Sequence, residues 1–221
     1  MLQITRSADL TMVGATGGAW VAPLGTPSPV GLGTPLAPWA GLGAISDDGL
    51  KFGIDEDHKE FSPWGVTSAF RTQITKSVRT FGLTLWETNN PVVKSLVFRI
   101  PVTDLAPDKD GIARFAESAS PKPDRRAFYF LTVDGDTMEG FYVPAGEVTD
   151  RSDVTYKSEE MAGYDITITA YPDASNVTVY HAFTASIPPA ANGAPKASDV
   201  ITPKPTTGQT TPTQADFAPA A

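Results

Sequence analysis

Cysteine is absent from the 221 residues, and histidine occurs only twice. Without cysteine the chain forms neither disulfides nor thiolate metal sites, which suits assembly in a reducing cytoplasm. No apolar run approaches the roughly 20 residues that span a bilayer, and the first residues lack the apolar core of a signal peptide. The sequence therefore predicts a protein that is not exported and has no contact with a membrane.

Residues that carry catalysis or bind metals are equally sparse. His58 follows three acidic residues at 55–57, but adjacent side chains on an extended chain point in opposite directions, which favours a solvated acidic turn over a metal site. Residues 106–117 imitate part of a calcium loop, yet the first ligand position is an alanine and prolines replace the flanking helices. We find no catalytic triad, paired catalytic carboxylates or nucleotide fingerprint, so we expect no enzyme activity and no cofactor.

Positive charge is in short supply, since 17 lysines and arginines face 25 acidic residues and the net charge is −8. Binding to nucleic acid depends largely on neutralising phosphates with basic side chains. An acidic chain of this kind is not expected to bind DNA specifically.

Proline is concentrated at the two ends of the chain. Of 20 prolines, five lie within 23–38 and seven within 188–219. Such segments sustain neither helices nor central strands. The sequence predicts an extended N-terminal arm over 1–40, a β domain over 41–185, and a Pro/Ala/Thr-rich C-terminal extension over 186–221.

Alternating apolar and polar residues predict about eight short strands. Between 66 and 87 the alternation changes phase somewhere from Thr75 to Thr80, which predicts a hairpin turn or a bulge there. An Asp-Gly-Asp segment at 134–136 predicts a tight hairpin between two apolar strands. The predicted strands lie at 10–13, 19–21, 66–87, 112–115, 126–133, 138–143, 147–157, 163–171 and 177–183.

One short helix is predicted after residue 90. Asn90 suits the N-cap, Pro91 suits the first helical position, and the apolar residues of 92–97 recur at helical spacing. A mainly β fold follows, with a two-sheet β-sandwich or open barrel and one short flanking α-helix.

Four segments occur in a distinctive order. The stretch 41–98 holds an acidic SDDGL turn, a WG pivot and a Thr-rich strand that ends in ETNN before the helix. AWVAPLGT precedes it at 19–26, and VPAGEV at 143–148 and YDITITAY at 164–171 follow it. In this order the segments resemble the major tail proteins, or tail tube proteins, of long-tailed, siphovirus-type bacteriophages.

The resemblance implies two packed β-sheets with a flanking helix, in a subunit that polymerises as stacked hexameric rings into the phage tail tube. The tube would conduct DNA into the host, with transient passage and no specific binding. Expected partners are further copies of the chain, the tape measure protein and the tail-end proteins. Assembly in the host cytoplasm and a final place in the virion tail are also implied.

Three groups of candidate site residues follow from this reading. The candidate lumen face is the polar side of strand 163–171 and of the strand before it: Asp153, Thr155, Asp165, Thr167 and Thr169. Candidate ring or subunit contacts are apolar arm residues, the acidic segment and one tryptophan: Trp20, Leu24, Leu32, Trp39, Asp55, Asp57 and Trp64. Candidate ion pairs, across strands or between subunits, join Glu87 to Arg71 or Arg79.

Each group has a plainer interpretation that stays open. The polar strand face can be an ordinary solvated surface, the arm residues can pack on their own domain, and Trp64 can belong to the core. Two other functions also stay open. One is another phage structural protein, such as a tail terminator or decoration protein. The other is a carbohydrate-binding or adhesin β-sandwich that uses Trp39, Trp64 and Trp86.

Overall fold

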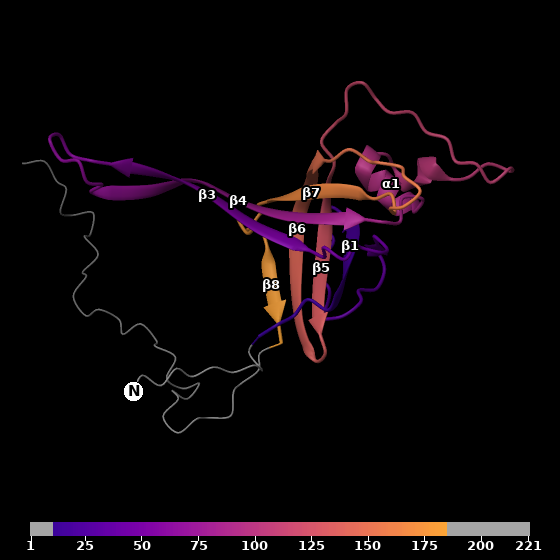
Figure 1. Ribbon diagram of the computed structural model, residues 1–221, viewed down its shortest axis with the longest axis horizontal. Coiled ribbons are helices and arrows are strands. Elements are labelled where there is room, and N and C mark those ends of the chain that lie inside the picture. The colour runs from indigo at the N-terminus through magenta and orange to yellow at the C-terminus, as the bar shows by residue number, and fades with distance from the viewer. Residues whose placement is uncertain (1–10, 185–221) are drawn as a thin grey trace, which may run out of the picture. The chain divides into compact units, whose positions relative to one another are not determined.

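Every strand of the described part of the chain, residues 11–184, joins one antiparallel sheet in the computed structural model (Figure 1). The strand order is β2-β1-β5-β6-β7-β4-β3, and β8 pairs with β6 beside this path. The strands are β1 (Thr16–Pro23), β2 (Ala40–Gly41), β3 (Lys51–Phe61), β4 (Arg71–Leu85), β5 (Arg125–Asp134), β6 (Thr137–Arg151), β7 (Tyr164–Tyr171) and β8 (Tyr180–Phe183). The α-helix α1 (Pro91–Phe98) and a 3-10 turn, η2 (Val102–Leu105), follow β4. The mainly β fold with one short helix is confirmed, although the two predicted sheets are one continuous sheet.

Strand β6 is where this sheet changes direction. One side of β6 pairs with β5, while the other side pairs first with β8 over 139–142 and then with β7 over 145–151. The sheet folds over at this strand, so that β4 comes to face β5. Phe81 of β4 stacks on Phe130 of β5 with ring centroids 4.6 Å apart, although β6 and β7 separate these strands in the sheet order.

Pro144 lies within β6, at a point where two predicted strands turn out to be one. The ladder between β5 and β6 shifts register between Arg126 and Phe128, whose partners are Gly146 and Val143. Proline has no N–H to donate, and such an irregularity accommodates it without the loss of a ladder bond. The strands predicted at 138–143 and 147–157 are therefore continuous, and residues 152–157 lie beyond the end at Arg151.

The core lies between the two halves of the folded sheet. Phe81, Phe128 and Phe130 are fully buried, and β7 contributes Ile166 and Ile168. In β7 the buried residues alternate with exposed or half-buried Asp and Thr side chains, as the sequence predicted. Alternation of this kind packs one face of a strand and leaves the other face open.

Helix α1 forms where the sequence predicted it. The Oδ1 atom of Asn90 accepts a hydrogen bond from the backbone N–H of Val92 at 2.9 Å, and Pro91 occupies the first turn. The helix ends at Arg99, which adopts a left-handed conformation with φ of 57°. Val93 and Leu96 anchor the helix by joining the core.

The predicted phase change in β4 is a bulge. Asp57 pairs with Lys76 and His58 pairs with Ile74, so Thr75 has no partner in the ladder. The strand runs on through this point, and the hairpin turn lies earlier, within 62–70. An extra residue in one strand reverses which side chains face the core, and this explains the change of phase.

Other predicted elements differ from the structure. Residues 106–124 form no strand, so the predicted strand at 112–115 is wrong, and the last strand is only Tyr180–Phe183. Residues 11–13 are not a strand, and residue 10 lies outside the described residues, as does the predicted extension over 186–221. Within the predicted arm, β1 pairs along its whole length with β5.

The stack of Phe81 on Phe130 can be tested by truncation. Because Phe81 is fully buried, Phe81→Ala is expected to lower the free energy of unfolding by about 3–5 kcal/mol. Urea denaturation followed by circular dichroism measures this loss. Phe70→Ala is the matched control, since Phe70 is 83% exposed and its loss is expected to cost less than about 0.5 kcal/mol. Equal effects of the two substitutions would contradict the proposed core.

Candidate assembly surfaces

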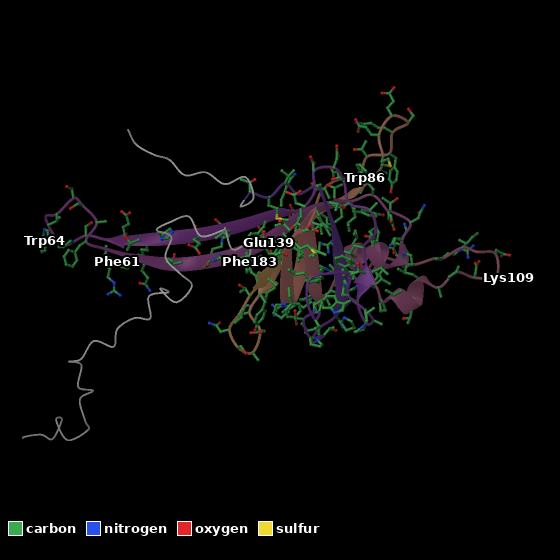
Figure 2. All side chains as sticks on the ribbon, turned by 90° about the horizontal axis from the view of Figure 1, so that it is seen from below. Phe61, Trp64, Trp86, Lys109, Glu139 and Phe183 are labelled. Atoms are coloured by element: carbon green, nitrogen blue, oxygen red, sulfur yellow. The ribbon has the colours of Figure 1, made fainter. Side chains whose placement is uncertain are left out.

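Strands β3 and β4 form a long hairpin whose outer half extends beyond the rest of the sheet (Figures 1 and 2). Its tip carries Trp64, which is 104% exposed and therefore contacts no core. The hairpin exposes further large apolar side chains: Ile54, Phe61, Val66, Phe70 and Ile74. Several large apolar side chains exposed on one part of a folded subunit are typical of a protein contact site.

Charged pairs hold the middle of this hairpin together. Lys76 Nζ lies 3.0 Å from an Asp55 carboxylate oxygen and 3.9 Å from one of Asp57, and the two carboxylates raise the pKa of Lys76. Across the strands, Glu56 accepts hydrogen bonds from Ser77 at 2.9 Å and Arg79 at 3.0 Å, and these bonds lower the pKa of Glu56. Lys76 and its two partners are exposed, so their pairs fix register more than they stabilise the fold, whereas the pair of Arg79 and Glu56 is half-buried.

The acidic segment at 55–57 is thus a strand and not the predicted solvated turn. The misleading feature was its three consecutive carboxylates, which are unusual in strands. The compensating cations, Lys76 and Arg79, lie about 20 residues further along the chain. Phe52 and Ile54 alternate with polar residues just before the acidic run, and this was the available signal for β3.

The four candidate residues of the predicted arm divide into two groups. Trp20 and Trp39 pack against Tyr129 of β5, with ring centroids 5.7 and 6.2 Å apart, and Leu32 lies beside Gly140 of β6. Leu24 remains 57% exposed. The first three residues therefore cover the outer face of their own sheet, which leaves only Leu24 of this set available to a neighbour.

The open face of β7 carries Asp165, Thr167 and Thr169. In the ladder, β4 places Thr84 opposite Asp165 and Thr80 opposite Thr169, so hydroxyl groups continue across both strands. The Oγ1 atoms of Thr149 and Thr169 lie 2.7 Å apart, and Ser152 Oγ donates to Asp165 Oδ2 at 3.1 Å. We call Asp165, Thr167, Thr169, Thr80 and Thr84 the hydroxyl face.

Asp153 and Thr155 do not belong to the hydroxyl face in the way that the sequence predicted. Strand β6 ends at Arg151, so both residues lie in the loop that leads to β7. Both are exposed. On β6 the ladder partner of Thr169 is Glu147, and the side chain that contacts Thr169 is that of Thr149, at a bulge between Val148 and Asp150.

The three residues of the predicted ion pairs are not joined within the subunit. Glu87 accepts hydrogen bonds from the backbone N–H of Ala44 at 2.9 Å and from the Asn90 side chain at 3.0 Å. Arg79 pairs with Glu56, while Arg71 lies near the outer end of the hairpin, opposite Phe61 in the ladder. Glu87 has a structural role here: it ties the chain before β3 to the start of α1.

Acidic and histidine side chains do not assemble into a metal site in the part of the chain that the structure describes. Asp108, in the calcium-like segment, accepts the backbone N–H groups of Asp110 and Ile112 and pairs with Arg114. Its carboxylate therefore closes a turn. Neither helix in 11–184 has the length and apolar character that a membrane span requires.

An exposed apolar hairpin and a hydroxyl-rich sheet face, in a mainly β subunit, fit a protein that assembles with copies of itself. A family model described as Phage tail tube protein matches residues 4–191. The chain belongs to this family.

Membership of the tail tube protein family makes the chain a structural component of a phage tail, and not an enzyme. It also implies that the chain assembles with its own copies into a tube. No curated protein matches the chain. The tail tube assignment thus comes from the family model.

The exposure of Trp64 predicts a spectroscopic property of the free subunit. Acrylamide is expected to quench Trp64 emission most strongly, because the other three tryptophans are half-buried. A Trp64→Phe variant should lose the most quenchable component of the fluorescence. Trp39→Phe is the matched control and should keep that component. The opposite result would place Trp64 in a packed environment.

Proposed function

We propose that the chain is the repeating subunit of the tail tube of a siphovirus-type phage, in which hexameric rings stack around a channel for DNA ejection. The observation that carries this proposal is the hairpin of β3 and β4, whose outer half presents apolar side chains beyond the subunit's own core. Family membership supports tube assembly, and the hairpin supplies a contact for it.

The hairpin is suited to bridge subunits because its inner part packs on the core and its outer part is exposed. Near the sheet, Phe52 and Phe81 fix it to the core, with ring centroids 5.0 Å apart. Further out, Trp64 and Phe70 are 104% and 83% exposed. Burying apolar surface contributes roughly 25 cal/mol per Å². A neighbour that covers both aromatic rings would therefore gain binding free energy without any change in the subunit's core.

Asp55 and Asp57 act in this proposal as supports of the contact. Their pairing with Lys76 holds the two strands in register just inside the apolar tip. Leu24 provides a second exposed apolar position, outside the hairpin. Pairing of Glu87 with Arg71 or Arg79 of another copy is a less direct possibility, since Glu87 already accepts two hydrogen bonds within the subunit.

The hydroxyl face is the proposed channel lining. It is polar, and its central residues on β7 carry hydroxyl groups and a carboxylate but no cation. A basic lining would bind phosphates through counterion release and slow the DNA. Hydroxyl groups and carboxylates offer no such attraction. Asp153 and Thr155, in the loop that leads to β7, would lie at the margin of this lining.

Assembly in the host cytoplasm, together with the tape measure protein and the tail-end proteins, completes the proposal. The chain has no cysteine, so its assembly is independent of disulfide formation.

The hairpin contact predicts a separation of folding from assembly. The double variant Trp64→Ser and Phe70→Ser is expected to keep the wild-type melting temperature, because both side chains are exposed in the subunit. It should form few or no tubes, whereas the wild type should give tubes or six-fold rings. Negative-stain electron microscopy and light scattering measure assembly.

Tyr156→Ser is the matched control, since Tyr156 is 74% exposed on another loop. This variant is expected to assemble as the wild type does. Normal tubes from the double variant would exclude the hairpin as the main contact. Persistent wild-type monomers at high concentration would oppose the proposed function itself.

The channel lining predicts a change in chemical accessibility. A Thr167→Cys variant has a single thiol, because the native chain lacks cysteine. In free subunits this thiol should react with a maleimide carried on a large polymer, and in tubes the same reaction should become slow. Lys109→Cys, on an exposed loop (Figure 2), is the control for reagent access. Unchanged labelling of the Thr167→Cys variant in tubes would exclude this face as the lining.

A further inference from the structure

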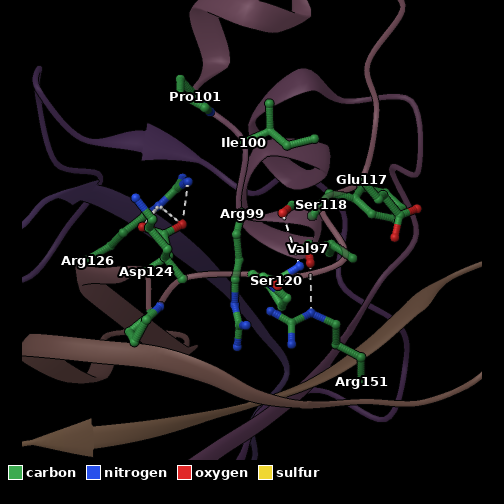
Figure 3. A pocket seen from close by; sticks show the side chains of 14 residues that line it. Val97, Arg99, Ile100, Pro101, Glu117, Ser118, Ser120, Asp124, Arg126 and Arg151 are labelled. Atoms are coloured by element: carbon green, nitrogen blue, oxygen red, sulfur yellow. Dashed lines mark hydrogen bonds and ion pairs between the residues drawn. The ribbon is translucent and has the colours of Figure 1, made fainter.

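A pocket of about 730 Å³ lies at the C-terminal end of helix α1 (Figure 3). The end of the helix, the loop before β5, the start of β5 and the end of β6 form its walls. Its lining holds four cationic side chains, Arg99, Lys122, Arg126 and Arg151, but only two carboxylates, Glu117 and Asp124. In a chain with net charge −8, such a local excess of positive charge is unexpected.

Arg126 is fully accounted for by its own contacts. It forms a close pair with Asp124, with Nη2 and Oδ2 2.8 Å apart. Its Nη2 atom also donates to the Ser95 carbonyl at 3.1 Å and to the Ser95 hydroxyl at 3.0 Å. Arg126 therefore carries its own counterion and satisfies a carbonyl near the helix end.

Arg151 is different, because it forms no ion pair with a carboxylate of residues 11–184. Its Nε donates a hydrogen bond to the Val97 carbonyl at 2.7 Å, so this edge of the guanidinium group has a partner. Its Nη2 is buried and has no hydrogen-bond partner among residues 11–184, and no carboxylate of that part of the chain lies within 4.0 Å. Burial and the nearby positive charge of Arg99 lower the pKa of Arg151.

Arg99 adds a second donor at the same place. Its Nη2 donates to the Val148 carbonyl at 3.2 Å and lies 3.6 Å from Glu147, but its Nε is also buried without a partner among the described residues. Glu147 is shared with Arg125, 3.7 Å away on its other oxygen. Buried donors and buried charges without partners are costly, so two guanidinium groups in one pocket favour an anionic ligand.

We propose that Arg151 and Arg99 form a carboxylate-binding site, and that in the tube it receives an acidic side chain of a second copy of this chain. Planar guanidinium groups bind carboxylates through paired hydrogen bonds, and partly buried pairs of this kind are strong. The chain itself supplies an excess of carboxylates, 25 against 17 basic residues. The choice of a second copy rests on the proposed tube assembly, whereas the carboxylate chemistry rests on the pocket alone.

Two variants of the full chain test the site. Arg151→Gln removes the charge yet keeps a group that can donate to Val97. Arg114→Gln is the matched control, because it removes the same charge from an arginine that pairs with Asp108, and neither residue lines the pocket. Arg151→Lys, which keeps the charge but loses the planar fork, should lie between the wild type and Arg151→Gln. Circular dichroism melting curves establish that each variant is folded before it is compared.

The first measurement is calorimetric titration of unassembled subunits with succinate at constant ionic strength. Arg151→Gln should bind succinate at least about tenfold more weakly than the wild type. Arg114→Gln should stay within about twofold, because its charge is exposed and lies outside the pocket. No binding by the wild type, or equal binding by Arg151→Gln, would overturn the site.

The second measurement is the rate of tube assembly, by light scattering and electron microscopy. Arg151→Gln should assemble at least about tenfold more slowly than Arg114→Gln, and free succinate should slow the wild type. If Arg151→Gln loses succinate binding but assembles normally, the ligand is a free anion and the assignment to a second copy is overturned. If the wild type forms no tubes at all, the proposed function fails. The succinate titration alone then decides whether the pocket binds carboxylates.

Discussion

The fold depends on the contact between Phe81 and Phe130, which joins the two halves of one sheet face to face. Strand β6 makes this contact possible, because it pairs with β8 over one part of its length and with β7 over another. An open sheet of the same strands would expose its apolar face on one side. Folding the sheet at β6 buries that face against itself, and helix α1 adds Val93 and Leu96 to the same core.

This closure decides which surfaces remain available for assembly. The core uses β4 only in its second part, where Phe81, Leu83 and Leu85 are buried. Outward of Arg79, where β4 parts from β7, β3 and β4 pair only with each other among the described strands, and ion pairs such as Lys76 with Asp55 replace core packing. The apolar side chains of the outer hairpin are therefore exposed by the geometry of the sheet. In a family whose members form tubes, exposed apolar side chains of this kind are suited to contacts between subunits.

Features set by neighbouring residues were predicted from the sequence, and features set by distant residues were not. The cap of α1 by Asn90 and the alternation in β7 depend on local spacing, and both predictions are confirmed. Strand β3 was missed because its acidic run is stabilised by cations on β4. Pro144 led to the prediction that a strand ends there, yet the register shift opposite this residue keeps β6 continuous. Likewise, the contact of Trp39 with Tyr129 joins segments far apart in the chain.

The positive charges differ between the proposed channel face and the pocket at the end of α1. Register places Lys51 on the proposed channel side, opposite Gly82 and hence Thr167, and the same alternation along β3 and β4 places Lys76 there. Lys51 lies 3.8 Å from Asp48, and Lys76 lies 3.0 Å from Asp55. Phosphates would have to compete with these carboxylates, so neither lysine offers DNA a free cation. Arg151 lies instead on the core side of the sheet, opposite Ile166, and donates to a helix carbonyl at the end of α1, with no carboxylate of residues 11–184 within 4.0 Å. Arg151 can therefore attract an acidic side chain of another copy without adding positive charge to the channel face, where it would slow the DNA.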